Sequence, residues 1–310
     1  MNKQNRDNLY ASSAIETISE VFLVEKESIK GIKTLKKGMT NRSFLFSVHG
    51  EKYIIRIPGE GTDQLINRAQ EAEVFKAISG KGLCDDPVYL DPQSGCKITR
   101  FLDNVRACDL NCNDDLERCM EKLRSFHEMK LCVGHTFDIF GQIEYYEYLW
   151  GGQPSEFSDY QQTKANVLSL KSLIDSMEKE WCLTHIDAVP DNFLFYIPKD
   201  GQKELLQLTD WEYAGMQDPH VDIAMFCIYS LYEKPQVDHL INIYFRNQCD
   251  QKTRAKIYAY IACCGLLWSN WCEFKRILGV HFGEYSQAQY RYAKEYYRYA
   301  LEELEGESDL

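Results

Sequence analysis

The stretch LTHIDAVPDNFLF, residues 183–195, places polar side chains that can do chemistry between two apolar, strand-like flanks. His185 lies two residues before Asp187, and Asn192 follows Asp187 by five residues. A further carboxylate, Asp210, ends the strand-like run LLQLTD 18 residues after Asn192. Taken alone, the first stretch is equally a polar turn between strands. The position of Asp210 after a second strand favours a catalytic site.

Phosphoryl transfer from ATP needs this set of side chains. Mg²⁺ is a hard cation that prefers oxygen ligands and takes few of them from the protein, the rest coming from phosphates and water. A separate carboxylate must orient the acceptor hydroxyl and take its proton. We therefore expect Asp187 to be the base and Asn192 and Asp210 to be the Mg²⁺ ligands.

A nucleotide-binding element precedes these residues in the chain. The β-rich runs SFLFSVH and KYIIRIP flank a turn at Gly50, which is the pattern of a β-hairpin. The preceding segment KKGMTN contains Gly38, Thr40 and Asn41, and the backbone N–H groups of such a turn can cradle phosphate oxygens. A lone glycine turn between strands is more often only a turn, so this signal is weak by itself.

Arg56 is a cation within the otherwise apolar run KYIIRIP. It is either an outward-facing residue of an alternating strand or the cation that binds the α and β phosphates. Glu71, on an amphipathic helix expected over residues 67–78, could pair with Arg56 and aim it. Glu73 competes for this role, and solvation of the helix surface is the simpler explanation for both glutamates.

The kind of element changes along the chain. Strand-like runs dominate up to about residue 101. Helical spacing then dominates in residues 114–129, 160–178, 221–232, 237–247, 252–278 and 286–304. These patterns predict an α+β protein with a β-rich N-terminal lobe, residues 1–101, that binds the nucleotide. A mostly helical C-terminal lobe, residues 102–310, would carry catalysis and acceptor binding.

Composition narrows the partners and the compartment. The 310 residues include 35 Lys+Arg against 47 Asp+Glu, and the formal charge of −12 would repel a nucleic acid. Twelve Cys are scattered without a CxxC pair, which is typical of a reduced, cytoplasmic protein. The N-terminus lacks the apolar core of a signal peptide, and the longest uncharged run, residues 257–272, is short for a membrane span. We expect no stable membrane association, and the oligomeric state stays open.

Four segments carry a resemblance to a known family: GMTNRSF, YIIRIPG, HIDAVPDNFLF and DWEYAGMQDPHVDIA, which together span most of residues 38–222. In this order they resemble the choline/ethanolamine kinase family, and within it the bacterial LicA-type branch. The family belongs to the protein-kinase-like and aminoglycoside-phosphotransferase-like superfamily. The resemblance implies a bilobal protein-kinase-like fold with ATP in the cleft, its adenine against a linker that includes Thr99 and Phe101.

The resemblance also implies individual roles. Asp187 would be the catalytic base, Asn192 and Asp210 the Mg²⁺ ligands, Arg56 the phosphate-binding cation, Asp222 a buried carboxylate that hydrogen-bonds the catalytic-loop backbone, and His185 a residue that packs and orients the loop. Two positions depart from the family pattern, because Ile186 and Gln217 stand where the family usually or often has Asn. Neither departure removes a charge that the reaction needs.

Aromatic residues of the C-terminal third bear on the acceptor. Trp268 and Trp271 are three residues apart on an expected helix, and Phe282 and Tyr285 follow. Core packing is the commoner explanation of such a pair, but choline kinases carry a similar arrangement in their choline pocket. Aromatic faces bind a quaternary ammonium, which cannot donate a hydrogen bond. Further walls of the pocket would come from Tyr213, Tyr229 and Tyr232.

The sequence therefore predicts a choline kinase that uses ATP and Mg²⁺ to make phosphocholine. An ethanolamine kinase would need carboxylates or other hydrogen-bond acceptors in place of some aromatic walls. An aminoglycoside-type phosphotransferase would need a wide acidic cleft, against which the paired Trp argues. A nucleotide-binding pseudokinase, a different class of protein, would lack at least one of Asp187, Asn192 and Asp210, and all three are present.

Overall fold

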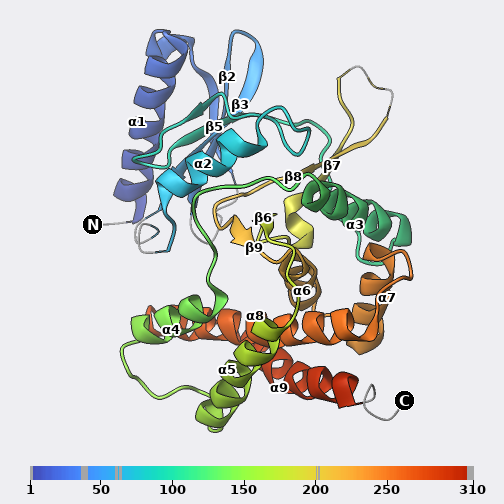
Figure 1. Ribbon diagram of the computed structural model, residues 1–310. Coiled ribbons are helices and arrows are strands. Elements are labelled where there is room, and N and C mark those ends of the chain that lie inside the picture. Colours follow the sequence, from blue (N-terminus) through green and yellow to red (C-terminus); the bar gives the residue numbers. More distant parts are fainter. Residues whose placement is uncertain are drawn as a thin grey trace. The chain divides into compact units, whose positions relative to one another are not determined.

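The structure is a computed structural model that describes residues 3–35, 41–59, 62, 65–199, 201 and 203–305. The chain forms two compact units, Met1–Arg106 with Leu194–Tyr213, and Ala107–Phe193 with Ala214–Leu310. A β-sheet dominates the first unit and helices dominate the second (Figure 1). The expected α+β architecture, with a β-rich N-lobe and a mostly helical C-lobe, is confirmed. The lobe boundary expected after residue 101 stays a prediction.

The first unit is built on a five-stranded antiparallel sheet in the order β1-β2-β3-β5-β4. Its strands are β1 (Lys30–Thr34), β2 (Asn41–Val48), β3 (Glu51–Pro58), β4 (Tyr89–Leu90) and β5 (Lys97–Arg100). The predicted hairpin joins β2 to β3 through His49 and Gly50, which both have positive φ, 54° and 81°. A two-residue type I′ turn requires positive φ at both central positions, and this turn fixes the register of the two strands.

The two faces of this sheet have different uses because side chains alternate along each strand. One face packs under α1 (Lys3–Phe22), which runs alongside β2 and β3 (Figure 1). This core contains Ala14 and Ile18 of α1 with Phe44, Phe46, Val48, Ile55 and Ile98 of the strands. The opposite face carries Arg56, with Lys97 directly across from it on β5, and Thr99 across from Ile54.

The helix after β3 was placed correctly from its periodicity. α2 spans Arg68–Ile78 and begins at Asn67, whose side chain accepts a hydrogen bond of 3.2 Å from the Gln70 amide. This N-cap satisfies one of the amides that the first turn of a helix leaves without a partner. Val74, Phe75 and Ile78 are buried, and so is the carboxylate of Glu71.

The second unit is mostly helical. Its helices are α3 (Asn113–Glu128), α4 (Ile139–Leu149), α5 (Tyr160–Ser176), α6 (His220–Tyr229), α7 (Lys234–Tyr244), α8 (Gln251–Ile277) and α9 (Glu284–Glu305). Its strands β6 (Cys182–Thr184) and β9 (Gly215–Gln217) pair with each other. The other two-stranded pair, β7 (Phe193–Tyr196) and β8 (Leu205–Leu208), belongs to the first unit except for Phe193. No helix of the described residues is long and apolar enough to cross a bilayer.

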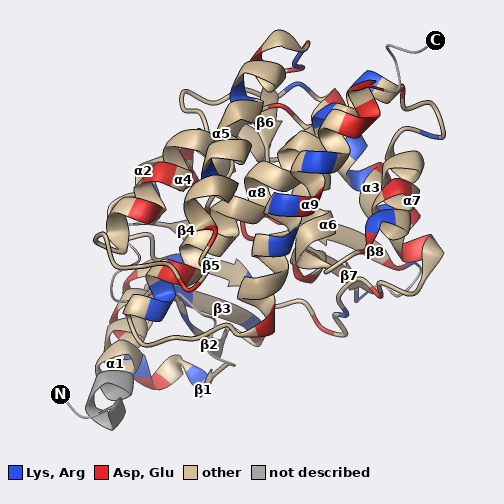
Figure 2. Ribbon diagram, turned by 90° about the horizontal axis from the view of Figure 1, so that it is seen from below, with Lys and Arg blue, Asp and Glu red and all other residues tan. Residues whose placement is uncertain are grey.

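Helix α8 is the central element of the second unit. It packs against α4, α5, α6 and α9, and its uncharged middle, residues 257–272, is almost entirely buried (Figure 2). Close approach to α9 depends on Gly265, because a Cβ there would lie 2.7 Å from the Gln289 carbonyl oxygen and 2.9 Å from the Ala293 nitrogen. Both are backbone atoms of the neighbouring helix, so this contact holds α8 and α9 together without room for a side chain.

We expect Gly265→Ala to destabilise the protein by roughly 1–3 kcal/mol in urea unfolding, since overpacking outweighs the gain in helix propensity of about 1 kcal/mol. Gly141→Ala in α4 is the matched control. Its Cβ would meet only side-chain atoms of Asp138, with Oδ2 at 2.6 Å and Cγ at 3.0 Å, and that side chain can rotate away. Equal losses of stability in the two variants would contradict the close-packing argument.

Candidate active site

The first unit holds a buried cluster of opposite charges centred on Arg56. One guanidinium nitrogen of Arg56 donates to Asp210 Oδ1, and the other donates to Glu71 Oε1. The Arg56 side chain is only 11% exposed. Burial alone would lower the pKa of Arg56, but Asp210, Glu71 and Glu212 outweigh it and raise that pKa. Arg56 is therefore held charged, and in one orientation, by three carboxylates.

Glu71, and not Glu73, is the glutamate of α2 that pairs with Arg56. Its carboxylate also accepts from Lys97 Nζ at 3.0 Å and from Arg68 Nη1 at 3.3 Å. Burial would raise the pKa of Glu71, but Lys97 and Arg56 overcome it and lower that pKa. Glu73 is exposed. A buried carboxylate between three cations serves as the electrostatic anchor of this cluster.

Three residues of the cluster, Arg68, Lys97 and Glu212, were missed in the sequence. Lys97 lies directly opposite Arg56 in the sheet, and a lysine within the short run KITR was the available signal. Glu212, two residues after Asp210, accepts from Asn41 Nδ2 at 3.2 Å and lies 3.3 Å from Arg56 Nη1. Burial, followed by the neighbouring Asp210, raises the pKa of Glu212. Two acidic side chains in DWEY thus converge on one arginine.

The other expected nucleotide-binding residues are placed as follows. Gly38 and Thr40 lie outside the described residues. Asn41 begins β2 and is buried against Glu212. Thr99 shares the sheet face of Arg56, and Phe101 follows β5 with its amide donating to the Lys52 carbonyl at 3.0 Å. Their contacts with a nucleotide stay predictions.

The second unit holds the loop of residues 185–192, which connects β6 to β7. Its backbone is fixed by Asp222, a fully buried residue in the first turn of α6. The Asp222 carboxylate accepts from the His185 amide at 2.9 Å and from the Ile186 amide at 2.7 Å. It also bonds His127 Nε2 at 2.9 Å. Asp222 thus makes the backbone contact expected of it, and its part in catalysis stays a prediction.

Ile186 stands in the left-handed region, with φ of 68°. A β-branched residue is a marked outlier there, and such strain costs on the order of 1–3 kcal/mol. Asn, which the family pattern led us to expect, tolerates this conformation better. The Ile186 side chain is fully buried, and its burial contributes about 1.5–3 kcal/mol, enough to offset the strain. The fold therefore tolerates Ile in place of Asn at this position.

Asp187 follows Ile186 and is held by Asn192. The Asn192 amide nitrogen donates to the Asp187 carbonyl at 2.8 Å and to Asp187 Oδ2 at 3.1 Å. A short 3-10 turn, Pro190–Asn192, returns the chain so that these two residues meet. Because the amide nitrogen is committed to Asp187, the atom of Asn192 suited to a cation is Oδ1.

Five of the expected acceptor residues form a row of aromatic rings. Ring centroids are 5.7 Å apart for Trp268 and Trp271, 4.9 Å for Trp271 and Phe282, 6.3 Å for Phe282 and Tyr285, and 6.2 Å for Tyr285 and Tyr229. The Tyr229 hydroxyl donates to Asp191 Oδ2 at 3.0 Å. Burial, with Asp191 and Asp187 adding to it, raises the pKa of Tyr229. The row therefore ends beside the carboxylates of the loop.

Tyr232 and Tyr213 are the two further acceptor candidates. Tyr232 is buried, with its hydroxyl donating to the Leu110 carbonyl at 3.4 Å and its own carbonyl accepting from Tyr292 at 2.7 Å. Tyr213 ends the segment that belongs to the first unit. Acceptor binding by either tyrosine stays a prediction, and the contacts of Tyr232 are those of a core residue.

The donor set fits magnesium chemistry. Asp210 and Asn192 supply a carboxylate and an amide oxygen, which are the hard ligands that Mg²⁺ takes in small number beside phosphates and water. Among the residues that the structure describes, no group of three or more His, Cys, Asp or Glu is arranged to hold a metal ion by itself. A metal ion at Asp210 or Asn192 would take its other ligands from phosphate oxygens and water.

A β-rich lobe with a buried cation–carboxylate cluster, followed by a helical lobe with an Asp–Asn loop held by a buried Asp, defines a protein-kinase-like phosphotransferase. The family model for choline/ethanolamine kinase matches residues 32–263. The chain belongs to the choline/ethanolamine kinase family. It is a kinase of small molecules.

Relatives and solved structures agree with this assignment. Protein LicA of Haemophilus influenzae strain Rd is 30% identical over 265 residues, which cover 80% of this chain and 94% of that protein. The crystal structure of choline kinase LicA from Streptococcus pneumoniae matches with a TM-score of 0.78 and 24% identity, over 93% of this chain and 99% of that one. An aminoglycoside phosphotransferase shares the fold at a TM-score of 0.63 and 15% identity, over 93% of this chain and 98% of that one.

Asp222→Asn should loosen the catalytic loop. An amide offers one acceptor oxygen where the carboxylate offers two, so at least one buried N–H would lose its partner, at a cost of about 1–3 kcal/mol. We expect that loss in urea unfolding, together with faster hydrogen exchange of the His185 and Ile186 amides. Asp191→Asn, in the same loop but exposed, should change stability by less than about 0.5 kcal/mol. Unchanged exchange in Asp222→Asn would show that the carboxylate does not hold the loop.

Proposed function

We propose that the protein is a choline kinase that transfers the γ-phosphate of ATP to the hydroxyl of choline. The observation that carries this proposal is the row of aromatic rings from Trp268 to Tyr229, which ends beside Asp191 and Asp187. Aromatic faces bind a quaternary ammonium with roughly 0.5–2 kcal/mol each. The likeness to LicA proteins supports the same acceptor.

In this proposal Asp187 acts on the acceptor. It accepts a hydrogen bond from the choline hydroxyl, orients the oxygen toward the γ-phosphorus, and takes the proton as the new P–O bond forms. The bond between the γ-phosphorus and the bridging oxygen breaks, and ADP leaves. Asn192 holds the Asp187 carboxylate in place. His185 and Asp222 would position the loop.

The nucleotide side of the proposal rests on the Arg56 cluster. Arg56, aimed by Glu71, would bind the α and β phosphates. Gly38, Thr40 and Asn41 would contact phosphate oxygens, and Thr99 and Phe101 would lie against the adenine. Mg²⁺ bound by Asn192 and Asp210 would neutralise charge on the transferring phosphoryl group. All twelve cysteines are free thiols, which supports a reduced, cytoplasmic setting.

Ethanolamine is the second candidate acceptor, and Asp191 is the observation that favours it. This exposed carboxylate lies at the end of the aromatic row, bonded to the Tyr229 hydroxyl. A primary ammonium donates three hydrogen bonds, and a carboxylate at that place could accept one. Choline remains the better fit because the rest of the row offers rings rather than acceptors.

A side-by-side assay of ADP release with choline and with ethanolamine tests the function. Choline should give the higher kcat/KM, and Asp187→Asn should lower kcat with choline by about 10²–10⁴-fold, as expected for loss of a base. Asp191→Asn is the control, since it removes a loop carboxylate that does not abstract the proton. Turnover of another alcohol but not choline would rule out the proposed acceptor. Full turnover by Asp187→Asn would rule out the proposed base.

The charge of Lys275 should affect how tightly the acceptor site binds choline. Its ammonium lies 5.2 Å from the Trp271 ring centroid, and burial lowers the pKa of this lysine. A cation on that ring opposes a second cation in the same row. Lys275→Met should therefore lower KM for choline by about two- to tenfold, the value of one aromatic face.

The pH dependence separates this charge effect from a change of shape. Choline carries its charge at every pH, whereas Lys275 loses its proton as the pH rises toward its lowered pKa. KM for choline in the native protein should thus fall as the pH rises from 7, and the fall should be complete below the ordinary lysine pKa of 10.5, whereas KM in Lys275→Met should stay constant. Lys275→Arg keeps the charge and should keep the high KM. Identical pH profiles in all three proteins would contradict the role of Lys275.

A further inference from the structure

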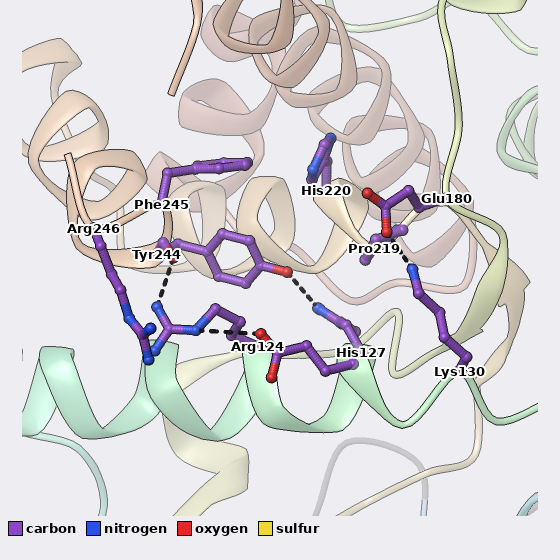
Figure 3. Close-up of a pocket in the computed structure, with 10 residues that line it drawn as sticks. Arg124, His127, Lys130, Glu180, Pro219, His220, Tyr244, Phe245 and Arg246 are labelled. Atoms are coloured by element: carbon purple, nitrogen blue, oxygen red, sulfur yellow. Dashed lines mark hydrogen bonds and ion pairs between the residues drawn. The ribbon is translucent and has the colours of Figure 1, made fainter. Parts of the chain in front are cut away.

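A second cavity lies in the helical unit, apart from the aromatic row. Its volume is about 240 Å³, and it is enclosed by α3, the start of α6, the end of α7 and the segments that follow α3 and α5 (Figure 3). Its walls are formed by Arg124, His127, Glu128, Lys130, Glu180, Pro219, His220, Tyr244, Phe245 and Arg246. One water needs only about 10–15 Å³, so a tetrahedral oxyanion with several waters fits.

Two guanidinium groups meet on one wall of this cavity. Arg124 comes from α3 and Arg246 from the turn after α7, and their side chains lie side by side in Figure 3. Burial, followed by the charge of Arg246, lowers the pKa of Arg124, so the pair is under mutual repulsion. Two converging guanidiniums form the forked set of donors that suits a phosphate group.

The charge of the cavity is balanced only by a carboxylate outside it. The lining has three Lys or Arg residues and two Glu residues, and Glu121, which pairs with both arginines, balances the one remaining positive charge. Burial lowers the pKa of His220 to about 4, which leaves its ring neutral at pH 7. The buried Arg124 Nε makes no hydrogen bond, and its ion-pair partner, Glu128 Oε1, lies 3.8 Å away (Figure 3). Such a donor costs free energy unless an acceptor reaches it.

The cavity is connected to the catalytic loop by an unbroken series of hydrogen bonds. Arg124 Nη1 donates to the Tyr244 carbonyl at 3.0 Å, and the Tyr244 hydroxyl bonds His127 Nδ1 at 2.8 Å. His127 Nε2 bonds Asp222, which holds the two loop amides before Asp187. Four hydrogen bonds thereby connect Arg124 to the Ile186 amide, which immediately precedes the proposed base Asp187.

We propose that this cavity is a regulatory site for a small phosphate group, bound between Arg124 and Arg246. The ligand is inorganic phosphate or a small phosphate monoester. The phosphate group takes the place of the Glu121 carboxylate between the two guanidiniums. A nucleotide polyphosphate or a nucleic acid carries more negative charge than these two cations can balance. Binding fixes Arg124, and through Tyr244, His127 and Asp222 it steadies the backbone of the loop.

Glu121 is the internal competitor for this site. Its carboxylate pairs with Arg124, and Arg246 Nη2 lies 3.3 Å from Glu121 Oε2. Glu121 is 55% exposed, so it bridges the pair from the solvent side and is not part of the cavity lining. The bridge shows that the two guanidiniums can hold one oxyanion between them. Removal of the Glu121 charge should therefore strengthen phosphate binding.

Calorimetric titration with inorganic phosphate at constant ionic strength tests the site, using the full chain with its nucleotide site filled by a non-hydrolysable ATP analogue. We expect one phosphate per chain in the native protein. Arg246→Gln should weaken binding about tenfold or more, and Glu121→Gln should strengthen it about threefold or more. Arg246 is chosen because it is 68% exposed, so its replacement leaves the fold intact. Arg298→Gln, on α9 and paired with Glu302, removes an equal charge elsewhere and should have no effect.

Two further measurements identify the ligand and the connection. Titration with glycerol 3-phosphate, a monoester that lacks the quaternary ammonium of the proposed acceptor, distinguishes a monoester from free phosphate as the preferred ligand. Tighter binding of either one supports the site if Arg246→Gln weakens it. Phosphate should slow hydrogen exchange of the His185 and Ile186 amides in the native protein but not in Tyr244→Phe, which lacks the hydroxyl. No binding by either ligand, or equal binding by Arg246→Gln and Arg298→Gln, would overturn the proposal. Unchanged exchange in the native protein would overturn the connection to the loop.

Discussion

The carboxylate of Asp222 is the interaction on which the conformation of the loop between β6 and β7 depends. It is fully buried, and its two oxygens accept from the His185 and Ile186 amides and bond His127. Hydrogen bonds to a charged group contribute more than neutral ones, about 1.5–3 kcal/mol each. Together these hydrogen bonds are strong enough to hold Ile186 in a strained conformation. They thereby fix the backbone immediately before Asp187.

The sheet unit solves a different problem, the burial of several charges together. Arg56, Arg68 and Lys97 surround Glu71, while Asp210 and Glu212 lie on the other side of Arg56. A single buried charge would be costly, and removing one partner of such a set leaves the others uncompensated. The mutual compensation keeps Arg56 charged and fixed in one orientation. If Arg56 binds phosphate as proposed, this is the preorganisation that phosphoryl transfer requires.

Much of this arrangement was predictable because it is local in the chain. The hairpin at Gly50, the helix after Asn67, the loop from His185 to Asn192 and the row that begins with Trp268 and Trp271 each lie within short segments with a clear pattern. Residues brought together from distant segments were harder. Lys97 and Glu212 gave only weak signals, and Tyr232, which has the helical spacing of a wall residue, lies among core contacts.

The sequence by itself determined the class of chemistry, because the spacing of Asp187, Asn192 and Asp210 and the alternation of polar and apolar residues are properties of the chain. Only the tertiary structure decided which partners meet. Glu71 and Glu73 are the same residue type on the same helix, and the sequence does not distinguish them. Residues two apart on a helix point roughly 200° from each other, so Glu71 faces Arg56 and Glu73 faces solvent. The series from Arg124 through Tyr244 and His127 to Asp222 likewise joins three helices, and their packing alone brings these side chains within hydrogen-bonding distance.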